Sequence, residues 1–125
     1  MKILVSGANG QLGKEITRIL DTGFAEIGEI PYILKNAEII KADIDDLDIT
    51  DIKNTISFVE NIRPQVIINC SAFTNVDLCE TERDTAFKVN SLGPRNLAIA
   101  AQKVNAKLIH ISTDYVFNGD GNEPY

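Results

Sequence analysis

The chain has 125 residues, of which 44% are hydrophobic and 24% are charged, and its formal net charge at pH 7 is −6. This composition is typical of one soluble domain; no apolar run approaches the roughly 18 residues of a membrane span, and the acidic balance excludes a nucleic-acid backbone as the expected partner. Because no signal-peptide pattern opens the chain and Cys70 and Cys79 follow no metal-binding spacing, we expect a cytoplasmic protein with reduced thiols and no metal ligands among these residues, which leaves a metal cofactor unknown.

The first predicted elements are a strand, a glycine-rich turn and a helix. Apolar residues 3–5 form the buried strand, and Gly7, Gly10 and Gly13 follow it. The apolar face of the helix consists of Leu12, Ile16, Ile19 and Leu20. The helix N-terminus offers unpaired N–H groups and a partial positive charge to a diphosphate; Gly10 leaves room for the phosphate, and Gly13 lets the helix approach its strand. The alternative is a turn that binds nothing, since the spacing differs from the usual G-x-G-x-x-G.

The segment between the first helix and the second strand lacks a clear period. The helix is predicted to end near Asp21, because Thr22 and Gly23 form a stop signal. Residues 24–38 are interrupted by glycine and proline, and we expect an irregular excursion or a short extra turn there. The second strand is then predicted over residues 39–42.

An acidic residue, Asp43, ends the second predicted strand. In dinucleotide-binding folds an acidic side chain at this place accepts a hydrogen bond from the ribose 2′-OH, which would favour NAD over NADP. Asp43 comes 30 positions after Gly13, farther than usual, and the excursion accounts for the difference. The alternative is that Asp43, Asp45 and Asp46 form a solvated loop.

A second helix and a third strand come next. Thr50 or Asp51 can cap this helix, and Pro64 ends it. Its apolar face holds Ile52, Ile56, Val59 and Ile62. Residues 66–70 are continuously apolar, as in a parallel strand that is buried on both faces. The small residues at 71–74 either let a cofactor cross the strand end or form a loop packed under a helix.

A long helix and a fourth strand complete the pattern. The helix is predicted over residues 81–104 and contains Pro94, whose ring would kink it. The kink would free the carbonyl of Asn90 for water or a ligand, or would serve the structure alone. The strand covers residues 108–111 and includes His110, the only histidine, which is predicted to be packed and hydrogen-bonded rather than catalytic.

The alternation of strands and helices predicts the fold class. Four strands separated by helices indicate an α/β fold with a doubly wound, Rossmann-like parallel sheet, truncated after about four strands. We expect right-handed crossovers and the strand order 3-2-1-4. Residues 112–115 follow the fourth strand, at the end of the sheet where such folds place their chemistry. The first half of such a fold holds the cofactor.

Five motifs in this order carry a resemblance to a known family. They are GANGQLG at 7–13, LDITD at 47–51, NCSAFTNVD at 69–77, VNSLGPRNL at 89–97 and STDYVF at 112–117. Together they resemble the extended short-chain dehydrogenase/reductases and, more narrowly, the dTDP-4-dehydrorhamnose reductase family. That family reduces the 4-keto group of dTDP-4-dehydro-L-rhamnose to dTDP-L-rhamnose, in nucleotide-sugar biosynthesis, with hydride from NADPH or NADH. The resemblance implies that residues 1–125 are a partial NAD(P)-binding domain. It also implies that the substrate-binding C-terminal part, through which a homodimer would form, is absent.

The resemblance also implies roles for individual residues. The cofactor diphosphate would lie along Gly7, Gly10, Gln11, Leu12 and Gly13. The adenosine ribose would meet Asp43, the adenine Asp48 and Ile49, and the nicotinamide half Ala72, Phe73 and Thr74. Thr113 would be the catalytic hydroxyl, and Thr113 and Asp114 would contact the substrate.

One part of the family's catalytic apparatus is not found in these residues. The family uses a Tyr-x-x-x-Lys pair after the Thr113 position, and neither Tyr115 nor Tyr125 has a lysine four residues later. We therefore expect a fragment that binds a nicotinamide dinucleotide without reducing a sugar. Two alternatives remain open: a 4-epimerase or 4,6-dehydratase of the same superfamily, and a non-catalytic, NADP-binding regulatory subunit of the methionine adenosyltransferase type.

Overall fold

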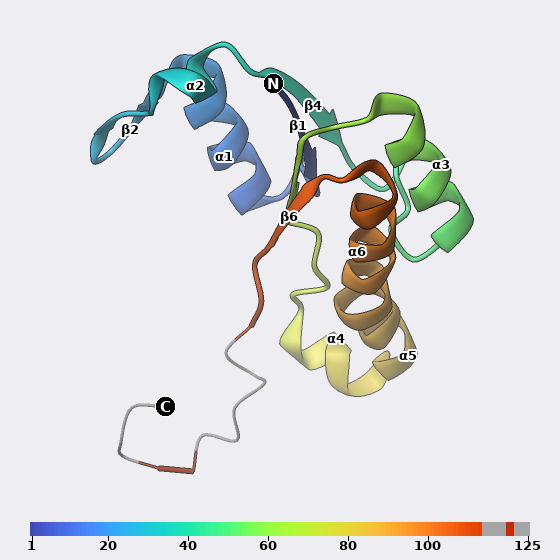
Figure 1. Ribbon diagram of the computed structural model, residues 1–125. Helices are drawn as coiled ribbons and strands as arrows, with labels where there is room; N and C mark the ends of the chain where they lie inside the picture. Colours follow the sequence, from blue (N-terminus) through green and yellow to red (C-terminus); the bar gives the residue numbers. More distant parts are fainter. Residues whose placement is uncertain (114–119, 122–125) are drawn as a thin grey trace.

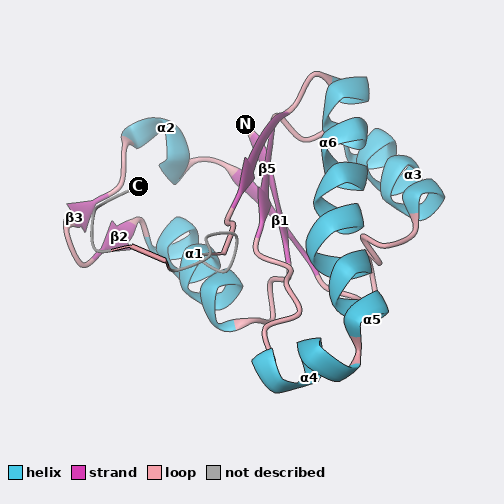
Figure 2. Ribbon diagram, turned by 90° about the horizontal axis from the view of Figure 1, so that it is seen from below, coloured by secondary structure: helices cyan, strands magenta, loops and turns pink. Residues whose placement is uncertain are grey.

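The computed structural model describes residues 1–113 and 120–121. Four parallel strands form the central sheet, in the order β4 (Glu38–Ala42), β1 (Lys2–Ser6), β5 (Val66–Asn69) and β6 (Lys107–His110). Figure 2 shows helices on both sides of this sheet, with α1 (Gln11–Thr22) on one side and α3 (Ile52–Ile62) and α6 (Gly93–Val104) on the other. The predicted α/β fold with a doubly wound parallel sheet is confirmed.

The predicted strand order of 3-2-1-4 is wrong. Numbered along the chain, the four sheet strands lie in the order 2-1-3-4, because β4 and β5 flank β1 on opposite sides. The chain moves from β1 to β4 with α1 on one face, and then reverses across β1 to β5 with α3 on the other face. Right-handed crossovers require this change of face when the direction reverses. The reversal creates a switch point between β1 and β5, where open α/β sheets bind ligands.

Side chains of the central strands alternate between two apolar layers. Ile3 and Val5 pack in the layer with α1, whereas Leu4 packs with Ile67 and Leu97 in the layer that α3 and α6 cover. Each of these last three side chains is fully buried. Full burial of such a side chain stabilises a fold by roughly 1.5–3 kcal/mol, so these residues hold α6 firmly on the sheet.

The first helix ends where the sequence predicts but buries a different face. Gly23 adopts a left-handed conformation with φ of 77°, and its N–H donates to the carbonyl of Ile19 at 2.9 Å. This confirms the predicted stop. Leu12, however, is 41% exposed, and the predicted apolar face is wrong at that position. Gly13 and Thr17 are buried instead, and at Gly13 the helix lies so close to the preceding loop that no side chain fits.

The excursion between α1 and β4 contains regular structure that the sequence pattern did not show. It forms an antiparallel pair, β2 (Phe24–Ala25) and β3 (Gly28–Glu29), followed by the short helix α2 (Tyr32–Lys35). Figure 1 shows this segment beside α1, away from α3 and α6. Strands of two residues are too short to produce a detectable alternation.

The helix predicted over residues 81–104 is present as one helical run over residues 83–104, but it is not α-helical throughout. The structure divides this stretch and the residues before it into α4 (Val76–Thr81), α5 (Arg83–Phe87), a π-helical turn η1 (Lys88–Leu92) and α6. The N–H of Gly93 donates to the carbonyl of Lys88, so the irregular turn ends just where Pro94 enters the first turn of α6, a position that proline tolerates.

Within the described part of the chain, no helix has the length and apolar character needed to cross a membrane.

Candidate functional site

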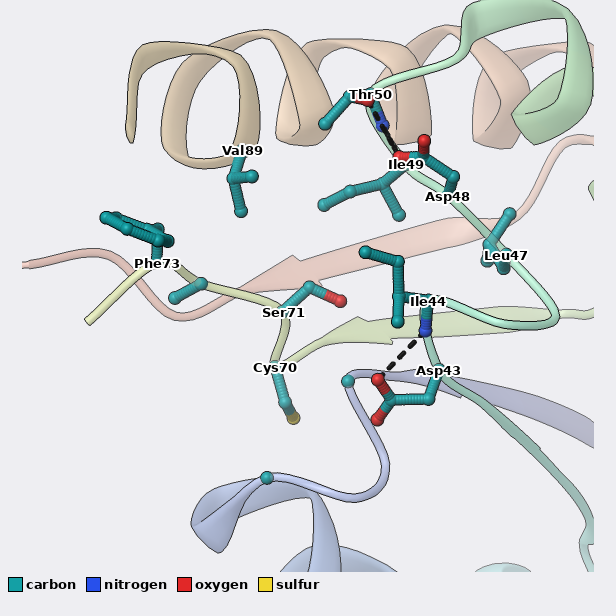
Figure 3. A pocket seen from close by; sticks show the side chains of 13 residues that line it. Asp43, Ile44, Leu47, Asp48, Ile49, Thr50, Cys70, Ser71, Phe73 and Val89 are labelled. Atoms are coloured by element: carbon teal, nitrogen blue, oxygen red, sulfur yellow. Dashed lines mark hydrogen bonds between the residues drawn. The ribbon is translucent and has the colours of Figure 1, made fainter. Parts of the chain in front are cut away.

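A pocket of about 290 Å³ lies at the carboxyl ends of β1, β4 and β5, close to the switch point of the sheet (Figure 3). Its walls come from the glycine-rich loop after β1, the loop after β4, the loop after β5, and η1. The lining residues are Gly7, Gly10, Asp43, Ile44, Leu47, Asp48, Ile49, Thr50, Cys70, Ser71, Ala72, Phe73 and Val89. This position is the one at which open α/β sheets hold dinucleotides.

Gly7 brings two walls of the pocket together. Its φ is 67°, in the left-handed region, and a Cβ atom there would lie 2.6 Å from the backbone nitrogen of Ser71. Both the conformation and the close approach therefore require glycine. As a result, the loop after β1 rests directly on the loop after β5.

Gly10 and Gly13 differ in what surrounds them. A Cβ atom on Gly13 would collide with the carbonyl oxygen of Gly7 and lie 2.7 Å from the Cα of Ala8, so packing within the chain requires this glycine. Gly10 has an ordinary φ of −71°, and a Cβ atom there would meet only the Gly7 oxygen, at 3.3 Å. The fold itself therefore explains Gly13, whereas Gly10 leaves space at the edge of the pocket.

The first turn of α1 begins at this open space. Its N-cap is Gly10, which has no side chain to accept from the first N–H groups, and the turn carries no acidic residue. At the start of α3, by contrast, the Asp51 carboxylate accepts from the N–H groups of Lys53 at 2.8 Å and Asn54 at 3.1 Å. The cap predicted at Thr50 or Asp51 is thus Asp51. An uncapped helix start carries a partial positive charge that suits an anionic group.

Asp43 stands beside the glycine-rich loop and lines the pocket. One carboxylate oxygen accepts from the N–H of Asn9 and the other from the N–H of Ile44, each at 2.8 Å (Figure 3 shows the second bond). Each oxygen keeps a further lone pair for a ligand hydroxyl. Asp45 and Asp46 are exposed and do not line the pocket, whereas Asp43 does.

The segment around Ile49 forms a rigid wall. The Asp48 carboxylate accepts from the backbone N–H of Thr50 at 2.8 Å and from its hydroxyl at 2.7 Å. The Ile49 side chain fills the space above Gly93, where a Cβ atom would lie 2.5 Å from its Cδ1. The Asn96 amide donates to the Ile49 carbonyl at 2.9 Å. The sequence offered no local signal for these last two contacts.

A buried polar cluster supports the loop after β5. The Oδ1 atom of Asn69 accepts from the Ser6 hydroxyl at 2.8 Å and from the Ser71 N–H at 3.0 Å. Its Nδ2 atom therefore faces the Nδ1 atom of His110, at 3.1 Å, which makes that ring nitrogen the acceptor. The predicted hydrogen bond of His110 is present, but its side chain is exposed rather than packed, because β6 is the outermost strand that the described residues form on this side of the sheet.

The peptide groups of Phe73 are fixed by side chains of the next helices. The N–H of Phe73 donates to the Asn90 Oδ1 atom at 2.8 Å, and the Asn90 Nδ2 atom donates to the Phe73 carbonyl at 3.0 Å. The thiol of Cys79 lies 3.7 Å from the same carbonyl. The sequence pointed to the carbonyl of Asn90, whereas in the structure its side-chain amide makes these contacts.

Both cysteines are free thiols. Cys70 lines the pocket, and its partial burial raises the pKa of its thiol. In the part of the chain that the structure describes, no group of three or more histidine, cysteine, aspartate or glutamate side chains could hold a metal ion.

The pocket gathers only some of the predicted site residues. Those that line it are Gly7, Gly10, Asp43, Asp48, Ile49, Ala72 and Phe73. Those that do not are Gln11, Leu12, Gly13, Thr74 and Thr113, of which Thr113 follows β6. Asp114 lies outside the described residues. The lining residues that the sequence did not indicate are Ile44, Leu47, Thr50, Cys70 and Val89, whereas Ser71 belongs to the predicted strand-end loop at 71–74. All of these except Val89 lie one or two positions from a predicted site residue. They would have been found by including two further residues on each side of those that the carboxyl ends of the strands indicated.

Comparisons with known proteins agree with this geometry. The family described as "RmlD substrate binding domain" matches residues 1–125. The dTDP-4-dehydrorhamnose reductase of Streptomyces griseus is 43% identical over 122 residues, which cover 98% of this chain and 36% of that protein. The solved structure of a dTDP-4-dehydrorhamnose reductase from Clostridium acetobutylicum is 47% identical, with a TM-score of 0.87, and covers 100% of this chain and 40% of its own.

A second solved structure holds a cofactor. It is the dTDP-4-dehydrorhamnose reductase of Bacillus anthracis in complex with NADP, which is 43% identical, has a TM-score of 0.82 and covers 96% of this chain and 38% of its own. The chain thus spans between 36% and 40% of the length of these relatives. The resemblance that the sequence motifs carry is confirmed, and the chain belongs to the RmlD substrate binding domain family.

Proposed function

We propose that this chain binds NADH or NADPH across the carboxyl ends of β1, β4 and β5, as the partial NAD(P)-binding domain of a dTDP-4-dehydrorhamnose reductase. The observation that carries the proposal is the start of α1. It is uncapped and borders the pocket at Gly10, a glycine that packing within the chain does not require. Room for a phosphate group explains that glycine, and free N–H groups of Gln11, Leu12 and Gly13 would hold the diphosphate oxygens.

The rest of the pocket suits the other parts of a dinucleotide. Asp43 would accept from the adenosine ribose, and Asp48 and Ile49 would lie beside the adenine. Residues 72–74 would pass beside the nicotinamide half, held in place by the amide of Asn90. The NADP complex of the Bacillus anthracis relative supports a nicotinamide dinucleotide as the ligand class.

The reaction would transfer hydride to the 4-keto carbon of dTDP-4-dehydro-L-rhamnose, giving dTDP-L-rhamnose. The dinucleotide supplies that hydride when bound. The Thr113 hydroxyl would donate a hydrogen bond to the keto oxygen, and Asp114 would contact the sugar nucleotide. A threonine hydroxyl holds its proton too tightly to be the general acid at neutral pH, so a residue outside these 125 would have to protonate the oxygen.

We also propose that the substrate is a small molecule and that the protein is cytoplasmic. A homodimer would form through the C-terminal part of the reductase, outside these 125 residues. The relatives described above carry the name of the reductase, and nothing in them favours an epimerase, a dehydratase or a methionine adenosyltransferase regulatory subunit.

Titration of the chain with NADH and NADPH, followed by nicotinamide fluorescence, tests the proposal. We expect saturable binding of at least one of them. We also expect no oxidation of NADPH in the presence of dTDP-4-dehydrorhamnose, because the acid is not among these residues. A folded chain that binds neither dinucleotide would overturn the proposed cofactor site. Turnover at a normal enzyme rate of roughly 1–10³ s⁻¹ would show that these residues contain the acid after all.

A further inference from the structure

We infer that the ribose end of the pocket selects NADH over NADPH, an inference that rests on the proposed dinucleotide site. The two cofactors differ only at the adenosine 2′ position, which carries a hydroxyl in NADH and a phosphate in NADPH. The question is therefore which charges and hydrogen-bond partners meet that position.

Asp43 presents a carboxylate that cannot easily turn away. Both of its oxygens accept backbone N–H groups, from Asn9 and from Ile44, each at 2.8 Å. The first bond joins the loop after β4 to the glycine-rich loop, so rotation of the side chain would break a contact between two walls of the pocket. The remaining lone pairs can accept from a 2′-hydroxyl, but they repel a 2′-phosphate.

The surrounding charges reinforce this preference. Asp45 and Asp46 follow in the same loop, and Asp48 lines the pocket. None of the described residues that line the pocket is a lysine or an arginine. The nearest basic residue along the chain before Asp43 is Lys41, and its ammonium group is paired with the Asp21 carboxylate of α1 at 2.7 Å. A 2′-phosphate usually needs such a cation, and this site offers none from its lining.

The first measurement compares the dissociation constants of NADH and NADPH for the chain at low ionic strength. We expect NADH to bind at least ~10-fold more tightly, because the additional phosphate meets like charge at close range. The ratio should fall as the salt concentration rises towards about 0.5 M, since salt screens exposed charges. A preference that came from shape alone would not respond to salt in this way.

Variants locate the origin of the preference. Asp43→Asn keeps an oxygen that can accept from Asn9 and removes the charge, so the NADPH-to-NADH ratio of dissociation constants should fall towards one. If that variant does not fold, the double variant Asp45→Asn, Asp46→Asn removes negative charge from exposed positions of the same loop. It should improve NADPH binding severalfold without changing NADH binding. Glu26→Gln is the matched control, because it removes one unit of charge in the turn between β2 and β3.

The outcomes distinguish the preference for NADH from the proposed dinucleotide site on which it rests. Equal affinity for both cofactors, or tighter binding of NADPH, would overturn the inference and leave the dinucleotide site in place. The inference would also be overturned if the NADPH-to-NADH ratio of dissociation constants did not change with salt and was the same in the parent chain and the aspartate variants. Binding of neither cofactor by the folded chain would overturn the proposed site itself, and the inference with it.

Discussion

Helices α1 and α3 both begin after a residue with an extended backbone, but their first N–H groups are satisfied differently. At α3 the Asp51 carboxylate accepts from Lys53 and Asn54, so the chain itself satisfies two of the N–H groups that every helix leaves unpaired at its start. At α1 the corresponding residue is Gly10, which has no side chain to accept from these N–H groups and borders the pocket. The difference supports the proposal that the first turn of α1 serves binding, whereas that of α3 serves stability.

The loop before α1 and its first turn contain three glycines, and packing within the chain requires glycine at only two of them. Gly7 and Gly13 occupy places where a Cβ atom would collide with backbone, whereas Gly10 does not. Substitutions at these positions and at Asp51 should therefore separate effects on folding from effects on binding.

The largest expected effect is on stability, at Gly13. Gly13→Ala forces a methyl group against the Gly7 carbonyl and the Ala8 backbone, so we expect the free energy of unfolding to fall by about 3 kcal/mol. Urea denaturation followed by circular dichroism measures it. The matched control is Gly10→Ala, the same substitution three residues earlier, which should cost less than about 1 kcal/mol. Equal losses at both positions would contradict the distinction between these glycines.

The next effect is on binding, at Gly10. Gly10→Val suits the extended backbone of this residue but places a branched side chain at the edge of the pocket, so the dissociation constant for NADH should rise at least ~10-fold, about 1.4 kcal/mol. Isothermal titration calorimetry gives the affinity, and the melting temperature shows whether the variant is folded. A folded variant with the affinity of the parent chain would argue against a phosphate site at this turn.

At α3 we expect the opposite pattern. Asp51→Ala removes the side-chain cap and should lower the free energy of unfolding by about 1 kcal/mol, with no change in dinucleotide affinity. Asp51→Asn keeps a capping oxygen and is the control, with a smaller loss of stability. A large change in affinity on removing this cap would mean that α3 also takes part in binding.

The smallest expected effect concerns the two thiols. Burial raises the pKa of the Cys70 thiol above its ordinary value, so the reactive thiolate is scarce near neutral pH and alkylation should become faster as the pH is made alkaline. Bound NADH should slow the alkylation of Cys70, which lines the pocket, and leave that of Cys79 unchanged. Mass spectrometry after iodoacetamide treatment resolves the two sites, and equal protection of both would contradict the assigned pocket.

Local features of this protein could be predicted from its sequence, because local residues determine them. The strand, turn and helix around Gly7, Gly10 and Gly13 follow from hydrophobic periodicity and glycine spacing. The end of the helix follows from Gly23, since glycine readily takes the left-handed conformation found there. The position of Asp43 at a strand end could also be predicted. Its orientation could not, since this depends on a hydrogen bond to Asn9 across 34 positions.

Features that depend on packing between distant segments could not be predicted. The strand order depends on which face of the sheet receives α3, and no local pattern encodes that choice. The amide of Asn90 reaches Phe73 across 17 positions, and the division of the predicted long helix follows from the π-helical turn at η1. These contacts shape the side of the pocket that we propose for the nicotinamide, and sequence patterns predict their geometry least well.

The most direct test of the central claim follows the backbone amides of both helix starts by NMR during a titration with NADH. If the first turn of α1 holds the diphosphate, the amide resonances of Gln11, Leu12 and Gly13 should move on binding, while those of Lys53 and Asn54 stay in place. If NADH binds and the α1 amides do not move, the diphosphate lies elsewhere and the account of this site is wrong.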